Sequence, residues 1–62
     1  MRIRELRHEK GLTMKQVAIK AGVSEAAISL YERGLRKPTI VVAFKIAAAL
    51  GVTVDELIGK AG

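Results

Sequence analysis

Apolar residues recur along this chain three and four positions apart, which is the period of an amphipathic helix. Five helices are predicted, at about 2–10, 14–21, 25–33, 40–50 and 54–58. No segment alternates apolar and polar residues over any length, so we expect an all-α fold without a sheet. The positions predicted to face the core are Ile3, Leu6, Leu12, Val17, Ala18, Ala21, Val23, Ile28, Tyr31, Ile40, Ala43, Ile46, Ala47, Leu50, Val52 and Leu57.

Helix starts and ends are marked by their residue types. Thr13 and Thr53 are each followed three residues later by Gln or Glu, which predicts two capping boxes, and Ser24 and Thr39 are suitable N-caps. An apolar residue precedes three of these caps, and a second one follows it five positions later, as in a hydrophobic staple. Glycine stands where left-handed C-terminal caps are expected. These glycines are Gly11, Gly22, Gly34, Gly51 and Gly59.

Length and composition indicate one small domain over residues 1–62, soluble and cytoplasmic. No cysteine is present and His8 is the only histidine, so we expect no disulfide, no metal site and no cofactor. No apolar run approaches the ~20 residues of a membrane span, and the N-terminus lacks the apolar stretch of a signal peptide. Eleven Lys and Arg against six Asp and Glu give a net charge of +5, which favours a polyanion as partner.

The segment 13–33 places two short predicted helices around a tight turn, Ala21-Gly22-Val23-Ser24. This is the layout of a helix-turn-helix, whose second helix, here 25–33, enters the major groove of DNA. Ala18 and Gly22 are expected to let the two helices cross closely. A generic pair of helices can share this layout, so the turn alone does not decide the function.

The sequence resembles the Cro/lambda-repressor type of helix-turn-helix, also called the xenobiotic-response-element family, over nearly its whole length. The motifs that carry the resemblance are Gly11-Leu12-Thr13, Ala18, Ala21-Gly22-Val23-Ser24, Ile28-Ser29, Glu32-Arg33-Gly34 and Pro38. It implies a compact five-helix, lambda-repressor-like domain that binds double-stranded operator DNA in the nucleoid as a homodimer and acts as a repressor.

The resemblance also implies which residues read bases. They are Glu25, Ala26, Ala27 and Leu30, on the outward face of the second helix of the motif; Ser29 lies on the same face and can bond to a base or a phosphate. None offers the bidentate Arg–guanine or Gln–adenine contact, so we expect specificity to depend on contacts with thymine methyl groups and on DNA shape.

Phosphate contacts are expected from helix starts and from cations around the motif. The candidates are Arg7, Thr13, Met14, Lys15, Ser24, Arg33, Arg36 and Lys37. Met14 departs from the glutamine that many relatives carry there, which weakens that contact. The resemblance further implies an ion pair between Arg7 and Glu32; two independent surface charges are the alternative.

The remaining features concern partners other than DNA. The resemblance implies homodimer contacts at Val52, Val54, Leu57 and Ile58. Apolar residues at expected outward positions are Ile19, Leu35, Val41 and Val42. Such residues leave open a second function, in which the fold is a scaffold for protein binding, as in an antitoxin or a regulatory adaptor. His8 has no nucleophile beside it and no phosphate-binding glycine loop is present, so we expect neither an enzyme nor a small-molecule site.

Overall fold

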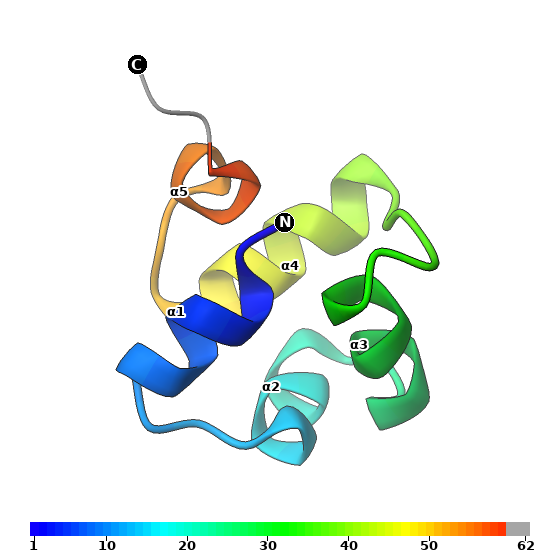
Figure 1. The fold of residues 1–62 in the computed structure, drawn as a ribbon, viewed down its shortest axis with the longest axis horizontal. Helices are drawn as coiled ribbons and strands as arrows, with labels where there is room; N and C mark the ends of the chain where they lie inside the picture. Colours follow the sequence, from blue (N-terminus) through cyan, green and yellow to red (C-terminus); the bar gives the residue numbers. More distant parts are fainter. Residues whose placement is uncertain (60–62) are drawn as a thin grey trace.

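The computed structural model of the protein describes residues 1–59 and consists of five helices (Figure 1). They are α1 (Ile3–Glu9), α2 (Met14–Ala21), α3 (Glu25–Glu32), α4 (Ile40–Leu50) and α5 (Val54–Ile58). No strand occurs within the described residues, so the predicted all-α class is confirmed. The predicted bounds hold for α2, α4 and α5, while α1 and α3 are one or two residues shorter than expected. Residues 60–62 of the predicted domain lie outside the described residues.

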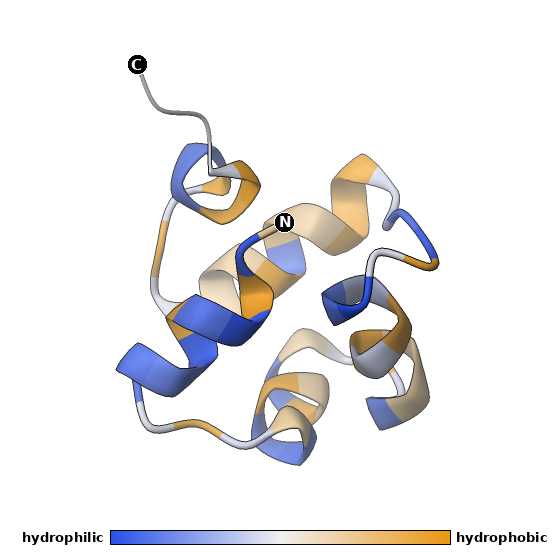
Figure 2. Ribbon diagram, in the orientation of Figure 1, coloured by the Kyte–Doolittle hydropathy of each residue, from blue (hydrophilic) through white to orange (hydrophobic). Residues whose placement is uncertain are grey.

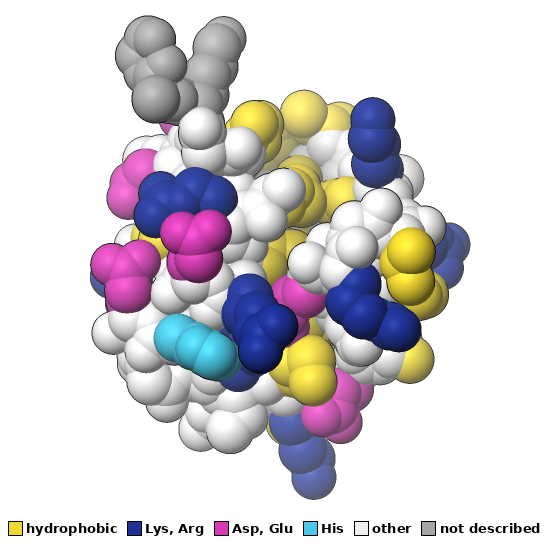
Figure 3. Space-filling view, in the orientation of Figure 1, with side chains coloured by type: hydrophobic (Ala, Val, Ile, Leu, Met, Phe, Trp, Pro, Cys, Tyr) yellow, Lys and Arg dark blue, Asp and Glu magenta, His cyan; other side chains and the backbone are white. Residues whose placement is uncertain are grey.

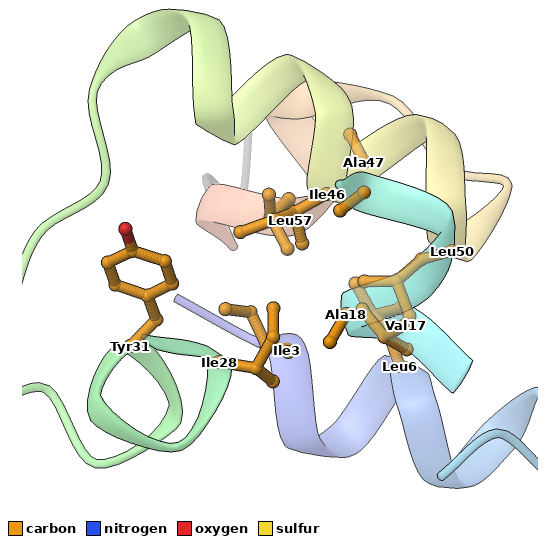
Figure 4. Packing of buried hydrophobic residues seen from close by; sticks show 11 residues of the cluster. Ile3, Leu6, Val17, Ala18, Ile28, Tyr31, Ile46, Ala47, Leu50 and Leu57 are labelled. Carbon is orange, nitrogen blue, oxygen red and sulfur yellow. The ribbon is translucent and has the colours of Figure 1, made fainter. Parts of the chain in front are cut away.

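Each of the five helices contributes one side chain that is completely buried at the centre of the molecule (Figure 4). These side chains are Ile3, Val17, Ile28, Ile46 and Leu57. Because all five helices meet in one cluster, no helix can be removed without exposing the core. A domain of this size buries only roughly 60% of the surface of its unfolded chain, so this cluster must supply most of the stability.

Helix α2 makes the most extensive packing contacts in the bundle, against α4 and α3. Alanines stand at these contacts, with Ala18 and Ala21 buried on α2 and Ala47 buried on α4. Small side chains let helix axes approach closely, as the sequence predicted at Ala18. The backbone N–H of Arg2 donates to the carbonyl oxygen of Leu57 at 2.7 Å and joins the chain before α1 to α5.

The predicted helix caps are confirmed. Thr13 and Thr53 both form complete capping boxes. Ser24 Oγ accepts a hydrogen bond from the backbone N–H of Ala27 at 3.0 Å, and Thr39 caps α4 in the same way. All five predicted glycines have a positive φ, between 67° and 75°.

The structure corrects the reason for one glycine. Gly22 was expected to allow close crossing of α2 and α3, but a Cβ at this position would meet no atom within 4 Å. Its φ of +70° is the actual requirement, because residues with a Cβ are strained in the left-handed region. Gly22 therefore sets the direction of the turn before α3.

The predicted core is correct except at the start of α4. Ile40 is 68% exposed although Ala43, three residues later, is buried, and Figure 2 shows the hydrophobic start of α4 at the edge of the molecule. The predictions for Leu12, Val23 and Val52 are met in part, since these side chains are half-buried against the core cluster.

The set of outward apolar residues also differs from the prediction. Val42 packs partly against the core, whereas Phe44 and Ile40 are exposed and were not expected to be. Ile19, Leu35 and Val41 are exposed as predicted. Within residues 1–59, no helix has both the length and the apolar character needed to cross a bilayer.

Candidate nucleic-acid interface

The turn at Gly22 places α3 at the edge of the molecule, where its outer side is not covered by another helix (Figure 1). Ile28 and Tyr31 hold the inner side of α3 in the core. Of the predicted base-reading residues, the structure leaves the first two fully exposed and the other three half-buried but still accessible. In chain order, these residues are Glu25, Ala26, Ala27, Ser29 and Leu30.

The start of α2 lies beside α3 and presents backbone donors. The N–H groups of Met14 and Lys15 have no hydrogen-bond acceptor among the described residues, whereas the N–H of Gln16 donates to Thr13 Oγ1 at 3.1 Å. Unpaired N–H groups and the helix dipole make such a start attractive to an anion. Lys15 is exposed at the same place and adds a full positive charge.

An ion pair joins α1 to the end of α3. Arg7 Nη2 lies 3.0 Å from Glu32 Oε1, and the exposed fractions of the two side chains are only 13% and 6%. Arg7 Nη1 also donates to the carbonyl oxygen of Leu12 at 3.1 Å. The predicted pair is therefore confirmed, and the alternative of two independent surface charges is wrong.

This geometry changes what Arg7 can do. Both terminal nitrogens of its guanidinium already donate inside the protein, and Nε is buried without a partner. Because the side chain faces inward, its main effect is to fix the position of α3 against α1 and the turn before α2. Arg7 was predicted as a phosphate contact, and the structure gives it only a small exposed surface for that purpose.

A hollow of about 240 Å³ opens in front of this ion pair. It is bounded by α1, the start of α2 and the end of α3, and its lining residues are Arg4, Arg7, Met14, Ser29, Glu32 and Arg33. Figure 3 looks onto this face and shows two groups of dark-blue cations on either side of a magenta carboxylate and a yellow apolar side chain. Sequence reasoning missed Arg4, although its position three residues before Arg7 places both on one side of α1.

The loop after α3 adds further cations. Arg33, Arg36 and Lys37 are all exposed, so each remains available to a phosphate as predicted. Arg33 Nε lies 3.4 Å from the carbonyl oxygen of Ser29, a long contact that keeps the side chain close to the end of α3. These three cations follow the C-terminal end of α3, and Lys15 lies in the first turn of α2.

The helix-turn-helix family model matches residues 3–57, which is nearly all of this structure. The chain belongs to the helix-turn-helix family. Two solved helix-turn-helix structures superpose closely on it, each at 38% sequence identity. The restriction-modification controller protein C.AhdI of Aeromonas hydrophila has a TM-score of 0.87, covering 90% of this chain and 85% of that one. The N-terminal DNA-binding domain of SinR from Bacillus subtilis has a TM-score of 0.85, covering 95% and 87%.

Similar sequences are named as HTH-type transcriptional regulators. An uncharacterised regulator of Sinorhizobium fredii is 45% identical over 53 residues, which are 86% of this chain and 69% of that protein. A regulator of Mycobacterium tuberculosis is 43% identical over 60 residues, or 97% of this chain. The chain spans only 43% of the length of that mycobacterial relative.

The four residues predicted to form a dimer contact differ from one another in their exposure. Leu57 is completely buried in the core, so it cannot face a partner, and this part of the prediction is corrected. Val52 and Val54 are half-buried against the core, while Ile58 is 51% exposed. Figure 3 shows yellow apolar side chains along the edge between α5 and the first turns of α4.

Proposed function

We propose that this chain is a DNA-binding transcriptional regulator that inserts α3 into the major groove of double-stranded DNA. The observation that carries the proposal is the accessible outer face of α3, held by the turn at Gly22, with exposed cations at the start of α2 and in the loop after α3. An α-helix fits the width of the major groove, and cations beside it can reach the phosphates that border the groove.

Contacts with the backbone fix the register of the helix on the duplex. The start of α2 offers two free N–H groups and Lys15, while the loop after α3 offers Arg33, Arg36 and Lys37. The capping hydroxyls of Thr13 and Ser24 stand at the two helix starts and are both exposed. These contacts give affinity without sequence information.

Base reading is proposed for the outer face of α3. Ala26, Ala27 and Leu30 present only methyl and methylene groups, which suit the 5-methyl group of thymine. Glu25 can accept a hydrogen bond from a cytosine amino group, and Ser29 can bond to a base or a phosphate. With no bidentate side chain on this face, part of the specificity comes from the energy of deforming the duplex.

Repression and dimerisation form the finer part of the proposal. One eight-residue helix reads few base pairs, so two copies on a two-fold symmetric operator, ~34 Å apart, give a longer site. A dimer bound across a promoter would block transcription and would lie with the chromosomal DNA in the cytoplasm. The exposed edge at Ile58 supports association of two copies.

Titration of duplex binding against salt tests this proposal. The logarithm of the association constant should fall linearly with the logarithm of the salt concentration, with a slope of about −0.9 per phosphate neutralised. Arg36→Gln should reduce the slope, whereas Lys20→Gln, which removes an exposed cation from the last turn of α2, should leave it unchanged. Duplexes selected from a random pool supply the DNA. Failure of the unmodified chain to bind any duplex in a salt-dependent way would favour a scaffold for protein binding instead.

A further inference from the structure

The hollow in front of the Arg7–Glu32 pair is lined by more positively than negatively charged side chains. Three arginines and one glutamate line it. Glu32 is paired with Arg7 at 3.0 Å, so that Arg4 and Arg33 are left without a carboxylate. Within residues 1–59, the side chain of Arg4 makes no hydrogen bond and no ion pair, whereas Arg2, the residue before α1, is paired with Glu5. The hollow therefore has two cations in excess.

These two cations come from different elements. Arg4 belongs to α1, and Arg33 is the C-cap residue of α3, so the helices place them on separate walls of the hollow. Met14 forms an apolar part of the lining at the start of α2 and supplies no side-chain hydrogen bond there. Any anion in the hollow must therefore be bound mainly by Arg4, Arg33 and the hydroxyl of Ser29.

Arg7 does not fill this role, because its terminal nitrogens are directed to Glu32 and to the carbonyl oxygen of Leu12. It instead forms the inner wall and keeps α1 and the end of α3 at a fixed separation. Arg7 is thus a positioning residue, and Arg4, one turn earlier on α1, is the cation of that helix which remains free to bind.

We propose that the hollow binds one phosphodiester of the DNA backbone, with Arg4 and Arg33 donating hydrogen bonds to its oxygens from opposite sides. The inference rests on the DNA binding proposed above, and it adds α1 to the elements that contact the duplex. Guanidinium groups suit phosphate because their planar N–H donors match the spacing of its oxygens. The hollow borders the start of α2 and the end of α3, next to the backbone N–H groups and cations to which the proposed function assigns phosphate contacts.

A salt titration of Arg4→Gln tests the proposal. The substitution should lower the affinity for every duplex by a similar factor and reduce the salt slope by about 0.9, the contribution of one phosphate. Lys45→Gln is the matched control, because Lys45 is an exposed cation on α4 that does not line the hollow. An unchanged slope for Arg4→Gln, together with normal binding by the unmodified chain, would overturn this inference and leave the proposed function standing.

A single uncharged linkage in the duplex locates the phosphate. Phosphates are replaced one at a time by methylphosphonate. At one position per half-site, the replacement should lower the affinity of the unmodified chain but should not lower the affinity of Arg4→Gln any further. The same position should appear for Arg33→Gln, since both arginines bind one phosphate. Different positions for the two variants would contradict a shared site.

Inorganic phosphate distinguishes a DNA phosphate from a free anion. Added without DNA, it should not saturate the hollow at millimolar concentration, as followed by NMR shifts of the Arg4 and Arg33 side chains. Saturable binding that is lost in Arg4→Gln would assign the hollow to a free phosphate compound and overturn its assignment to the DNA backbone.

Discussion

The buried ion pair between Arg7 and Glu32 is the residue-scale feature with the largest expected effect on stability. Two charges placed in a largely buried position are stabilising only as a pair, because each pays a large desolvation cost. The pair also crosses the bundle, joining residues 25 positions apart in the sequence. It therefore links the position of α3 to that of α1.

Glu32→Gln should reduce the free energy of unfolding by about 3 kcal/mol, because it leaves the Arg7 guanidinium buried without a counter-charge. Urea denaturation followed by circular dichroism measures the change. The double variant Arg7→Met with Glu32→Leu should regain most of the loss, since apolar side chains of similar size carry no desolvation cost. A loss below about 1 kcal/mol in the single variant would show that the pair behaves as a surface pair.

At this scale, the sequence predicted contacts that depend on neighbours along the chain or on the resemblance. The caps at Thr13 and Ser24 follow from side chains three residues or fewer from the amides they bind. Arg4 was missed because its significance arises only when the end of α3 is placed opposite α1. No local sequence pattern shows which of two arginines on one helix forms an ion pair with a carboxylate from another helix.

At the scale of elements, the cap of α3 has a structural role, and the proposed function gives it a binding role as well. Ser24 Oγ accepts from the N–H of Ala27 at 3.0 Å, and the same hydroxyl is exposed beside the outer face of α3. Thr39 caps α4 through Val42 in the same geometry but lies at the start of a different helix. The two caps form a natural pair for comparison.

Ser24→Ala and Thr39→Ala should each reduce the free energy of unfolding by about 1 kcal/mol, the usual effect of losing an N-cap side chain. Only Ser24→Ala should also weaken DNA binding under conditions where both variants remain folded. Ser24→Gly, which costs only a few tenths of a kcal/mol, separates the loss of the hydroxyl from the loss of stability. Equal DNA affinity of the two alanine variants would contradict a role for Ser24 in binding.

The five helices were predictable because each carries its own start and stop signals. These signals do not show how far along each helix the buried face extends. Ile40 has the spacing of a core residue on α4, yet it is 68% exposed, whereas Ala43 later in the same turn is buried. For Gly22, the predicted left-handed cap is confirmed, whereas the predicted close crossing of α2 and α3 is not the reason for a glycine there.

On the scale of the whole molecule, the apolar edge between α5 and α4 bears on the oligomeric state. Ile58→Glu should weaken the proposed homodimer, because it places a charge in the apolar contact without disturbing the buried Leu57. Ile19→Glu, a matched change at an exposed residue of α2, should leave association unchanged. Sedimentation equilibrium over a range of concentrations gives both results. A strictly monomeric unmodified chain would contradict the dimer while leaving binding of a single half-site possible.

The placement of α3 in the major groove is tested most directly by dimethyl sulfate protection of a bound duplex. The reagent methylates guanine N7 in the major groove and adenine N3 in the minor groove, so one experiment tests the accessibility of both grooves. If α3 enters the groove, guanine N7 should be protected within each half-site while adenine N3 at the same base steps stays reactive. Protection confined to adenine N3, or a bound duplex with no protected guanine, would contradict the placement of α3.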